Sequence, residues 1–276
     1  MPFSLKNYCL LLCVAIAFAR CADLKEVSAF GIASQQVMDR NKSANFGYYA
    51  YYHDSAFIYN YLPDHLRDVD CHCDAEKTAD ANIAREYALL STYFGLLAKF
   101  ADPKAAINFG PLGAPLPAGT YGHVTVSTTE AGIASGLATG LTALVTTGYK
   151  AKKIKPFMAA YRDSVAPLIT LLKIRADNIA GKIINLQLQL DRVTDSLITY
   201  AAHKEVKMPV LFVYEQKRKE LDQTLAAYQQ REQELENIIT GGQLIVDHLD
   251  NLHDKNFKDR IMSLVNAIAL NANVKF

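Results

Sequence analysis

The sequence predicts an all-α protein, an elongated antiparallel helical bundle with a long coiled-coil-like helical hairpin in its C-terminal half. Apolar residues recur every three or four positions over most of the chain, which is the period of an amphipathic helix. Residues 156–200 and 211–239 keep this period long enough to form the two arms of a hairpin. Apart from an irregular Pro- and Gly-rich loop at about 102–128, no convincing strand pattern is present.

The composition is that of a folded protein with balanced charge. Hydrophobic residues make up 50% of the chain and charged residues 21%, which does not fit disorder. The 29 Lys and Arg residues against 28 Asp and Glu residues argue against a nucleic-acid partner, which normally requires a basic excess. We expect one helical-bundle domain at residues 21–276, following a leader at residues 1–20.

The leader has the pattern of a secretory signal peptide. Lys6 supplies a positive charge, and residues 8–18 form an apolar run that is short for a bilayer span. Ala17-Phe18-Ala19 is a small-x-small cleavage pattern. We therefore expect export to the periplasm or outer membrane of a bacterial envelope, with secretion as the alternative.

Two processing outcomes are open next to this leader. Cleavage after Ala19 would leave Arg20 at the new terminus. The stretch F-A-R-C at residues 18–21 resembles a bacterial lipobox, although Arg20 replaces the small residue of that pattern. The resemblance implies lipid attachment at Cys21 and a membrane surface as a partner, since each buried methylene contributes about 0.8 kcal/mol. Otherwise Cys21 is free or disulfide-bonded on a soluble protein.

The first predicted helix begins near Asp23, a favourable N-cap residue, and bends near Gly47. Its continuation carries an aromatic run, F-G-Y-Y-A-Y-Y-H-D-S-A-F-I-Y-N-Y-L, at residues 46–62. Tyrosine is favoured at interfaces, and so many tyrosines around one helix cannot all face one core. We predict an interaction surface for an envelope protein or a glycan; the alternative is a helix packed on several sides. The predicted surface consists of Tyr48, Tyr49, Tyr51, Tyr52, Tyr59 and Tyr61.

A polar loop with the sequence D-V-D-C-H-C-D-A-E follows at residues 68–76, before a second predicted helix at 75–100. In an exported chain, a disulfide between Cys71 and Cys73 is favoured, because Cys21 is the only other cysteine beyond the leader. Free or intermolecular thiols are a second possibility. A metal site at Cys71, His72 and Cys73 is a third, although one intervening residue is fewer than the two to four of known zinc sites. No cofactor is expected.

Residues 131–148 carry no charge, and Gly132, Gly136 and Gly140 lie on one helical face. Small residues at this spacing let two helices approach closely, so we expect a central bundle helix. Ser127, with Glu130 three residues later, predicts its start. Exported bundles that hide an apolar hairpin resemble α-helical pore-forming toxins in general plan, although this chain has only one such segment. The alternative is therefore that this segment leaves the bundle and enters a bilayer.

The C-terminal half is the most regular part of the chain. Apolar steps of three and four alternate strictly from Leu211 to Ile239, which indicates a heptad seam. Arg218 and Glu232 occupy two seam positions, where they can pair within the chain or between two chains. We expect a turn at 203–209 before this arm, an interruption at 241–242, and a last helix at 256–272.

No P-loop, nucleophile elbow, H-E-x-x-H motif or dinucleotide fingerprint is present in the sequence. The sequence therefore favours a non-enzymatic envelope protein that acts by binding or scaffolding. The alternatives are a membrane-active bundle that deploys residues 131–148 and a periplasmic metal-binding protein.

Overall fold

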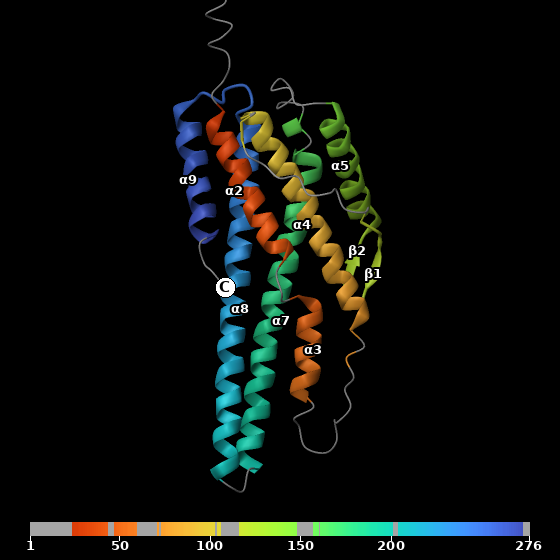
Figure 1. The fold of residues 1–276 in the computed structure, drawn as a ribbon, viewed down its shortest axis with the longest axis vertical. Helices are drawn as coiled ribbons and strands as arrows, with labels where there is room; N and C mark the ends of the chain where they lie inside the picture. The colour runs from red at the N-terminus through yellow and green to blue at the C-terminus, as the bar shows by residue number, and fades with distance from the viewer. Residues whose placement is uncertain are drawn as a thin grey trace, which may run out of the picture.

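The computed structural model describes residues 24–43, 47–59, 71, 73–102, 104–105, 116–147, 157–159, 161–200 and 204–272. Within these ranges the chain forms seven α-helices of at least 12 residues and one small antiparallel hairpin of strands. The all-α prediction is confirmed, and the helices run side by side as an elongated bundle (Figure 1).

The elements follow the chain from an N-terminal layer to a C-terminal hairpin. The first half contains α2 (Lys25–Lys42), α3 (Tyr48–Tyr59), α4 (Asp74–Ala101), β1 (Gly119–Tyr121), β2 (Val124–Val126) and α5 (Thr128–Thr147). The second half contains the π-helical turn η2 (Tyr161–Val165), α7 (Ala166–Tyr200), α8 (Lys204–Asp247) and α9 (Lys255–Ala272).

Helices α2 and α4 form a close antiparallel pair in the main core. Ser28 Oγ donates to the carbonyl oxygen of Ala98 at 3.2 Å. An added Cβ at Gly31 would lie 2.8 Å from backbone atoms of α4, so only glycine allows this approach. The rings of Phe30 and Phe94 meet edge to face with centroids 5.9 Å apart, and both are fully buried.

Helices α7 and α8 form the predicted hairpin, and its seam is closed within one chain. Leu221, Tyr228 and Leu235 of the predicted heptad are buried. Both charged seam residues find partners on the opposite arm: Arg218 Nη1 lies 2.7 Å from Asp191 Oδ1, and Glu232 lies 4.0 Å from Lys173 Nζ. These two charges therefore pair within the chain in the structure.

The second arm is longer than predicted. Helix α8 begins at Lys204, includes Pro209 and continues to Asp247, so the expected turn at 203–209 and the expected break at 241–242 are both wrong. The glycine pair lies inside the helix because large side chains pack on it. A Cβ at Gly241 would overlap with the ring of Phe30, and one at Gly242 with the ring of Tyr161.

The loop at 102–128 contains regular structure that the sequence analysis missed. Gly119–Tyr121 pairs with Val124–Val126 around a turn in which Gly122 has a φ of +57°, a conformation that favours glycine. The predicted helix start is confirmed, because Ser127 Oγ accepts a hydrogen bond from the Glu130 amide at 3.0 Å.

The expected close packing at the glycines of α5 is wrong. An added Cβ at any of these glycines would meet nothing within 4 Å among the described residues. The helix instead buries its opposite face, which carries Ala134, Leu137 and Leu141. The glycine face, with Gly132, Gly136 and Gly140, is left exposed.

Candidate functional site

Several predicted sites lie outside the described residues. These are the signal peptide at 1–20, the lipid-attachment residue Cys21, His72 of the metal hypothesis and Tyr61 of the aromatic surface. For Tyr59 only the backbone, at the end of α3, is described. Export, lipidation and metal binding therefore stay predictions.

Cys71 and Cys73 lie just before α4, and the structure joins their sulfurs in a disulfide. Their Cα atoms are 5.1 Å apart, within the range of disulfides. Among the described residues, no group of three or more His, Cys, Asp or Glu side chains is arranged to hold a metal ion. None of the described helices has the length and apolarity of a membrane span.

The predicted tyrosine surface is only partly a surface. Tyr48 and Tyr51 are buried, so they are wrong as members of an exposed patch, whereas Tyr49 and Tyr52 are half-buried. The two buried tyrosines belong to a hydrophobic cluster with Ile179 and Ile183 of α7. Lys182 of α7 also contacts the aromatic helix, and its Nζ lies 4.7 Å and 4.8 Å from the ring centres of Tyr51 and Tyr52. Lys182 Nζ also donates to the Tyr52 hydroxyl at 2.9 Å. Much of this aromatic helix therefore holds α3 against the hairpin.

The N-terminus of α3 is held by a carboxylate from another helix. Asp80 of α4 accepts hydrogen bonds from the amides of Tyr48 and Tyr49 at 2.9 Å and 3.0 Å. A Cβ at Gly47 would lie 2.5 Å from this carboxylate, so glycine permits the contact. Asp80 thus acts as a helix cap supplied from 31 or more residues away in the sequence.

The free end of the α7–α8 hairpin carries an apolar patch. Met208, Phe212 and Val213, in the first turns of α8, are 70%, 69% and 58% exposed, and we call these three residues the hairpin tip. The hairpin extends past α3 and ends alone at the bottom of Figure 1, while α2 begins at the opposite end of the bundle. Exposed Met and Phe residues of this kind are enriched at protein interfaces.

A buried charged cluster joins three helices beside α3. Arg175 of α7 donates from Nη1 to Glu86 Oε2 of α4 at 2.5 Å, and from Nη2 to Glu130 of α5. Burial raises the pKa of Glu86 to about 8, and Glu130 adds to the shift while Arg175 opposes it. The cluster has one cation for two carboxyl groups, so a proton on Glu86 balances its charge.

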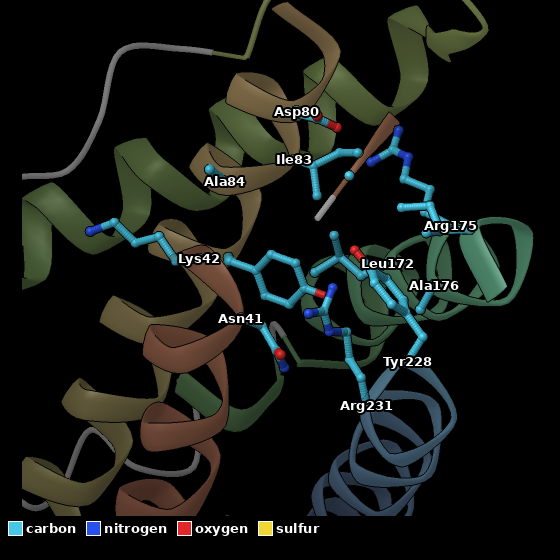
Figure 2. A pocket seen from close by; sticks show the side chains of 13 residues that line it. Asn41, Lys42, Asp80, Ile83, Ala84, Leu172, Arg175, Ala176, Tyr228 and Arg231 are labelled. Atoms are coloured by element: carbon cyan, nitrogen blue, oxygen red, sulfur yellow. The ribbon is translucent and has the colours of Figure 1, made fainter. Parts of the chain in front are cut away.

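A cavity with a volume of about 50 Å³ lies next to this cluster, between α2, α4, α7 and α8 (Figure 2). Its size is enough for about three to five water molecules or one small ion. Arg175 and Asp80 line one side, while Asn41 and Arg231 lie together on the other. The amine of Lys42 points away from the centre.

Two hydrogen-bond donors on the walls of this cavity lack acceptors. Asn41 Nδ2 and Arg231 Nε are buried and have no partner in the described part of the chain. The Arg231 guanidinium lies 4.1 Å from the centre of the Tyr228 ring. Glu234, one turn further along α8, is paired with Arg40 instead. The cavity therefore presents two buried donors, one of them on the half-buried guanidinium of Arg231.

This cavity could not be predicted from the sequence, because its residues are far apart in the chain and belong to no motif. One signal was available in retrospect: Arg231 lies next to Tyr228 and Glu232 of the predicted seam, where a charged residue is drawn into the hairpin interface.

Comparison of the chain with protein-family models, with curated proteins and with solved structures finds no match.

Proposed function

We propose that this protein is an exported, non-enzymatic binding protein of a bacterial envelope that engages a partner protein through the hairpin tip. The observation that carries the proposal is the exposure of Met208, Phe212 and Val213 at the free end of the two-helix hairpin. Three large apolar side chains held in water by a single helix end are a plain source of binding free energy.

The position of the tip favours a protein over the membrane that a lipid on Cys21 would enter. Helix α2 begins only a few residues after Cys21, and its N-terminal part lies near the C-terminal part of α8, where Glu26 pairs with Lys258 of α9. At about 1.5 Å per residue, the 44-residue α8 is about 65 Å long. An anchored chain would therefore hold the tip far from the anchoring membrane.

The hairpin is also suited to present the tip as a single chain. Its seam charges are satisfied between its own arms, Arg218 by Asp191 and Glu232 by Lys173 at 4.0 Å. A second arm from another copy is not required to neutralise them. This supports a tip that faces a different protein.

Site-specific photocrosslinking in the native cells tests the proposal. A photoreactive residue is placed at Phe212 of the full-length chain and, as a matched control, at Ile184 of α7, which is 45% exposed. We expect one discrete protein adduct from position 212 and none from 184, lost when Met208 and Val213 are replaced by serine. Adducts to lipid alone from position 212, or equal adducts from both positions, would overturn the proposal.

Fractionation of the same cells tests the anchor separately. Cys21→Ser should move the protein from the membrane to the soluble fraction without changing its helical circular dichroism spectrum. A chain that starts at Arg20 in the soluble fraction of the unmodified strain would remove the anchor. The photocrosslinking result at the hairpin tip does not depend on the outcome of this fractionation.

A further inference from the structure

The cavity between α2, α4, α7 and α8 has a guanidinium group on its wall, that of Arg231, which has no carboxylate partner among the described residues. A buried guanidinium is costly unless a counter-charge or hydrogen-bond acceptors replace the water it loses. Arg175 meets this requirement with the carboxyl groups of Glu86 and Glu130. Arg231 meets it only in part: the hydroxyls of Tyr228 and Tyr87 accept hydrogen bonds from its guanidinium, but in the segments that the structure describes it forms no ion pair with a carboxylate and its Nε has no acceptor.

The acidic groups near Arg231 are each occupied elsewhere. Asp80 lines the cavity, but its two carboxylate oxygens accept from the backbone amides at the start of α3. Glu234 is bound to Arg40 and also accepts from the Gln230 amide at 2.9 Å. The aromatic face of Tyr228 offers the guanidinium a cation–π contact, which supplies no acceptor for its Nε–H.

In the described part of the chain, the wall holds one further donor without an acceptor, on Asn41. Asn41, at the end of α2, is only 8% exposed, and its Nδ2 has no acceptor among the described residues. Tyr87 also lines the cavity, and its hydroxyl is neutral, because burial raises its pKa to about 12, so its hydrogen bond with Arg231 supplies no counter-charge. Buried donors that converge on one space call for an acceptor in that space.

We propose that this cavity binds one small oxyanion, held by the guanidinium of Arg231 and the amide of Asn41. The shared chemistry is a compact group with two or more negatively charged oxygens, either the carboxylate of a small organic acid or a tetrahedral ion such as phosphate. The Nε–H of arginine and an adjacent N–H form a fork that matches two such oxygens. A volume of about 50 Å³ admits an ion of this size.

The location gives the ion a structural consequence. Asn41 is near the end of α2, and Gly47, at the start of α3, also lines the cavity. An ion bound there would join the end of α2 to the hairpin through Arg231 of α8. Occupancy would thereby stabilise the joint between the N-terminal layer and the hairpin.

Calorimetric titration of the full-length exported protein tests the site. Sodium phosphate, sodium sulfate and sodium acetate are titrated separately at an ionic strength held constant with sodium chloride. We expect saturable binding of one ion per chain for at least one of the three salts. Acetate binding would identify a carboxylate site, and phosphate or sulfate binding a tetrahedral-ion site.

Three variants separate this site from general salt effects. Arg231→Gln should weaken the bound ion at least tenfold and Asn41→Leu severalfold, whereas Arg260→Gln, at an exposed position on α9, should leave binding unchanged. Circular dichroism checks that each variant is folded, and Asn41→Leu keeps the test valid if Arg231→Gln does not fold. Absence of saturable binding for all three salts, or equal binding by the native chain and both cavity variants, would overturn the proposal.

Discussion

Gly242 of α8 lies against the phenol ring of Tyr161, so closely that no Cβ fits between them. The Tyr161 hydroxyl donates to the carbonyl oxygen of Ile238 on the same helix at 3.0 Å. Tyr161 is fully buried, and burial raises its pKa well above the usual value of a tyrosine. Gly242 therefore leaves the space in which the Tyr161 ring, from the segment that leads into α7, packs against α8.

A side chain added at Gly242 should destabilise the protein. We expect Gly242→Ala to lower the free energy of unfolding by about 1–3 kcal/mol, because overpacking forces the Tyr161 ring to move. Urea denaturation measures the change. The matched control is Gly181→Ala in α7, where an added Cβ meets nothing within 4 Å and alanine should stabilise the helix by about 0.5–1 kcal/mol. Equal effects of the two substitutions would contradict this account.

The Glu86–Arg175–Glu130 cluster should make stability fall as pH rises. Burial raises the pKa of Glu86 to about 8 from its usual 4.5, so the folded chain binds a proton between these values that the unfolded chain does not. The stabilisation is complete below pH 4.5 and is lost as pH rises through 8. Urea denaturation between pH 5 and pH 9 should show a decrease that Glu86→Gln removes. A pH dependence that is the same in both proteins would contradict the assignment.

The pair between Arg218 and Asp191 should contribute little to stability and nothing to assembly. Both side chains are about one-third exposed, and ion pairs of this kind contribute about 0.2–1 kcal/mol. We expect Arg218→Gln to lower the free energy of unfolding within this range while the mass in solution, measured by light scattering, stays the same. A change of oligomeric state would show that the seam charges also pair between chains.

The Cys71–Cys73 disulfide should add about 1–2 kcal/mol, because it closes a very short loop and the entropy gain grows with loop length. Mass spectrometry after alkylation should find both thiols protected until the protein is reduced. Reduction should lower the free energy of unfolding of the native chain and leave a Cys71→Ser, Cys73→Ser variant unchanged. Two thiols that react without reduction would exclude the disulfide and favour the thiol or metal interpretations.

Helix positions could be predicted from the sequence where burial follows one period. The predicted helices at 75–100 and 256–272 match α4 and α9 to within one residue at each end. The heptad of α8 placed Leu221, Tyr228 and Leu235 in the interface, as observed. A periodic apolar face needs only one neighbour to bury it, so local pattern is sufficient information.

The role of glycine could not be predicted in the same way. Gly241 and Gly242 indicated a break, and Gly132, Gly136 and Gly140 indicated close packing, yet the structure has the opposite arrangement in both places. Whether another side chain packs on a glycine depends on residues that are distant in the sequence, such as Phe30 or Tyr161. That information is not local.

The cavity was missed for a related reason. Asn41 and Arg231 are separated by most of the chain, and each alone reads as an ordinary polar helix residue. Only the packing of α2 against α8 brings them to the same space. The tyrosines of α3 were predicted to form a surface, but part of this helix packs against the hairpin, where Lys182 of α7 lies over the rings of Tyr51 and Tyr52.

Because the seam of α7 and α8 is regular, the length of the hairpin sets how far the tip lies from the rest of the bundle. Insertion of one heptad into each arm would preserve the match between facing layers and lengthen the reach by about 10 Å. If the insertion is made near the hairpin tip, the core around Phe30 and Phe94 and the cavity at Arg231 lie toward the other end of the hairpin and would not change. The distance between the two ends of the molecule can therefore vary independently of the body that supports it.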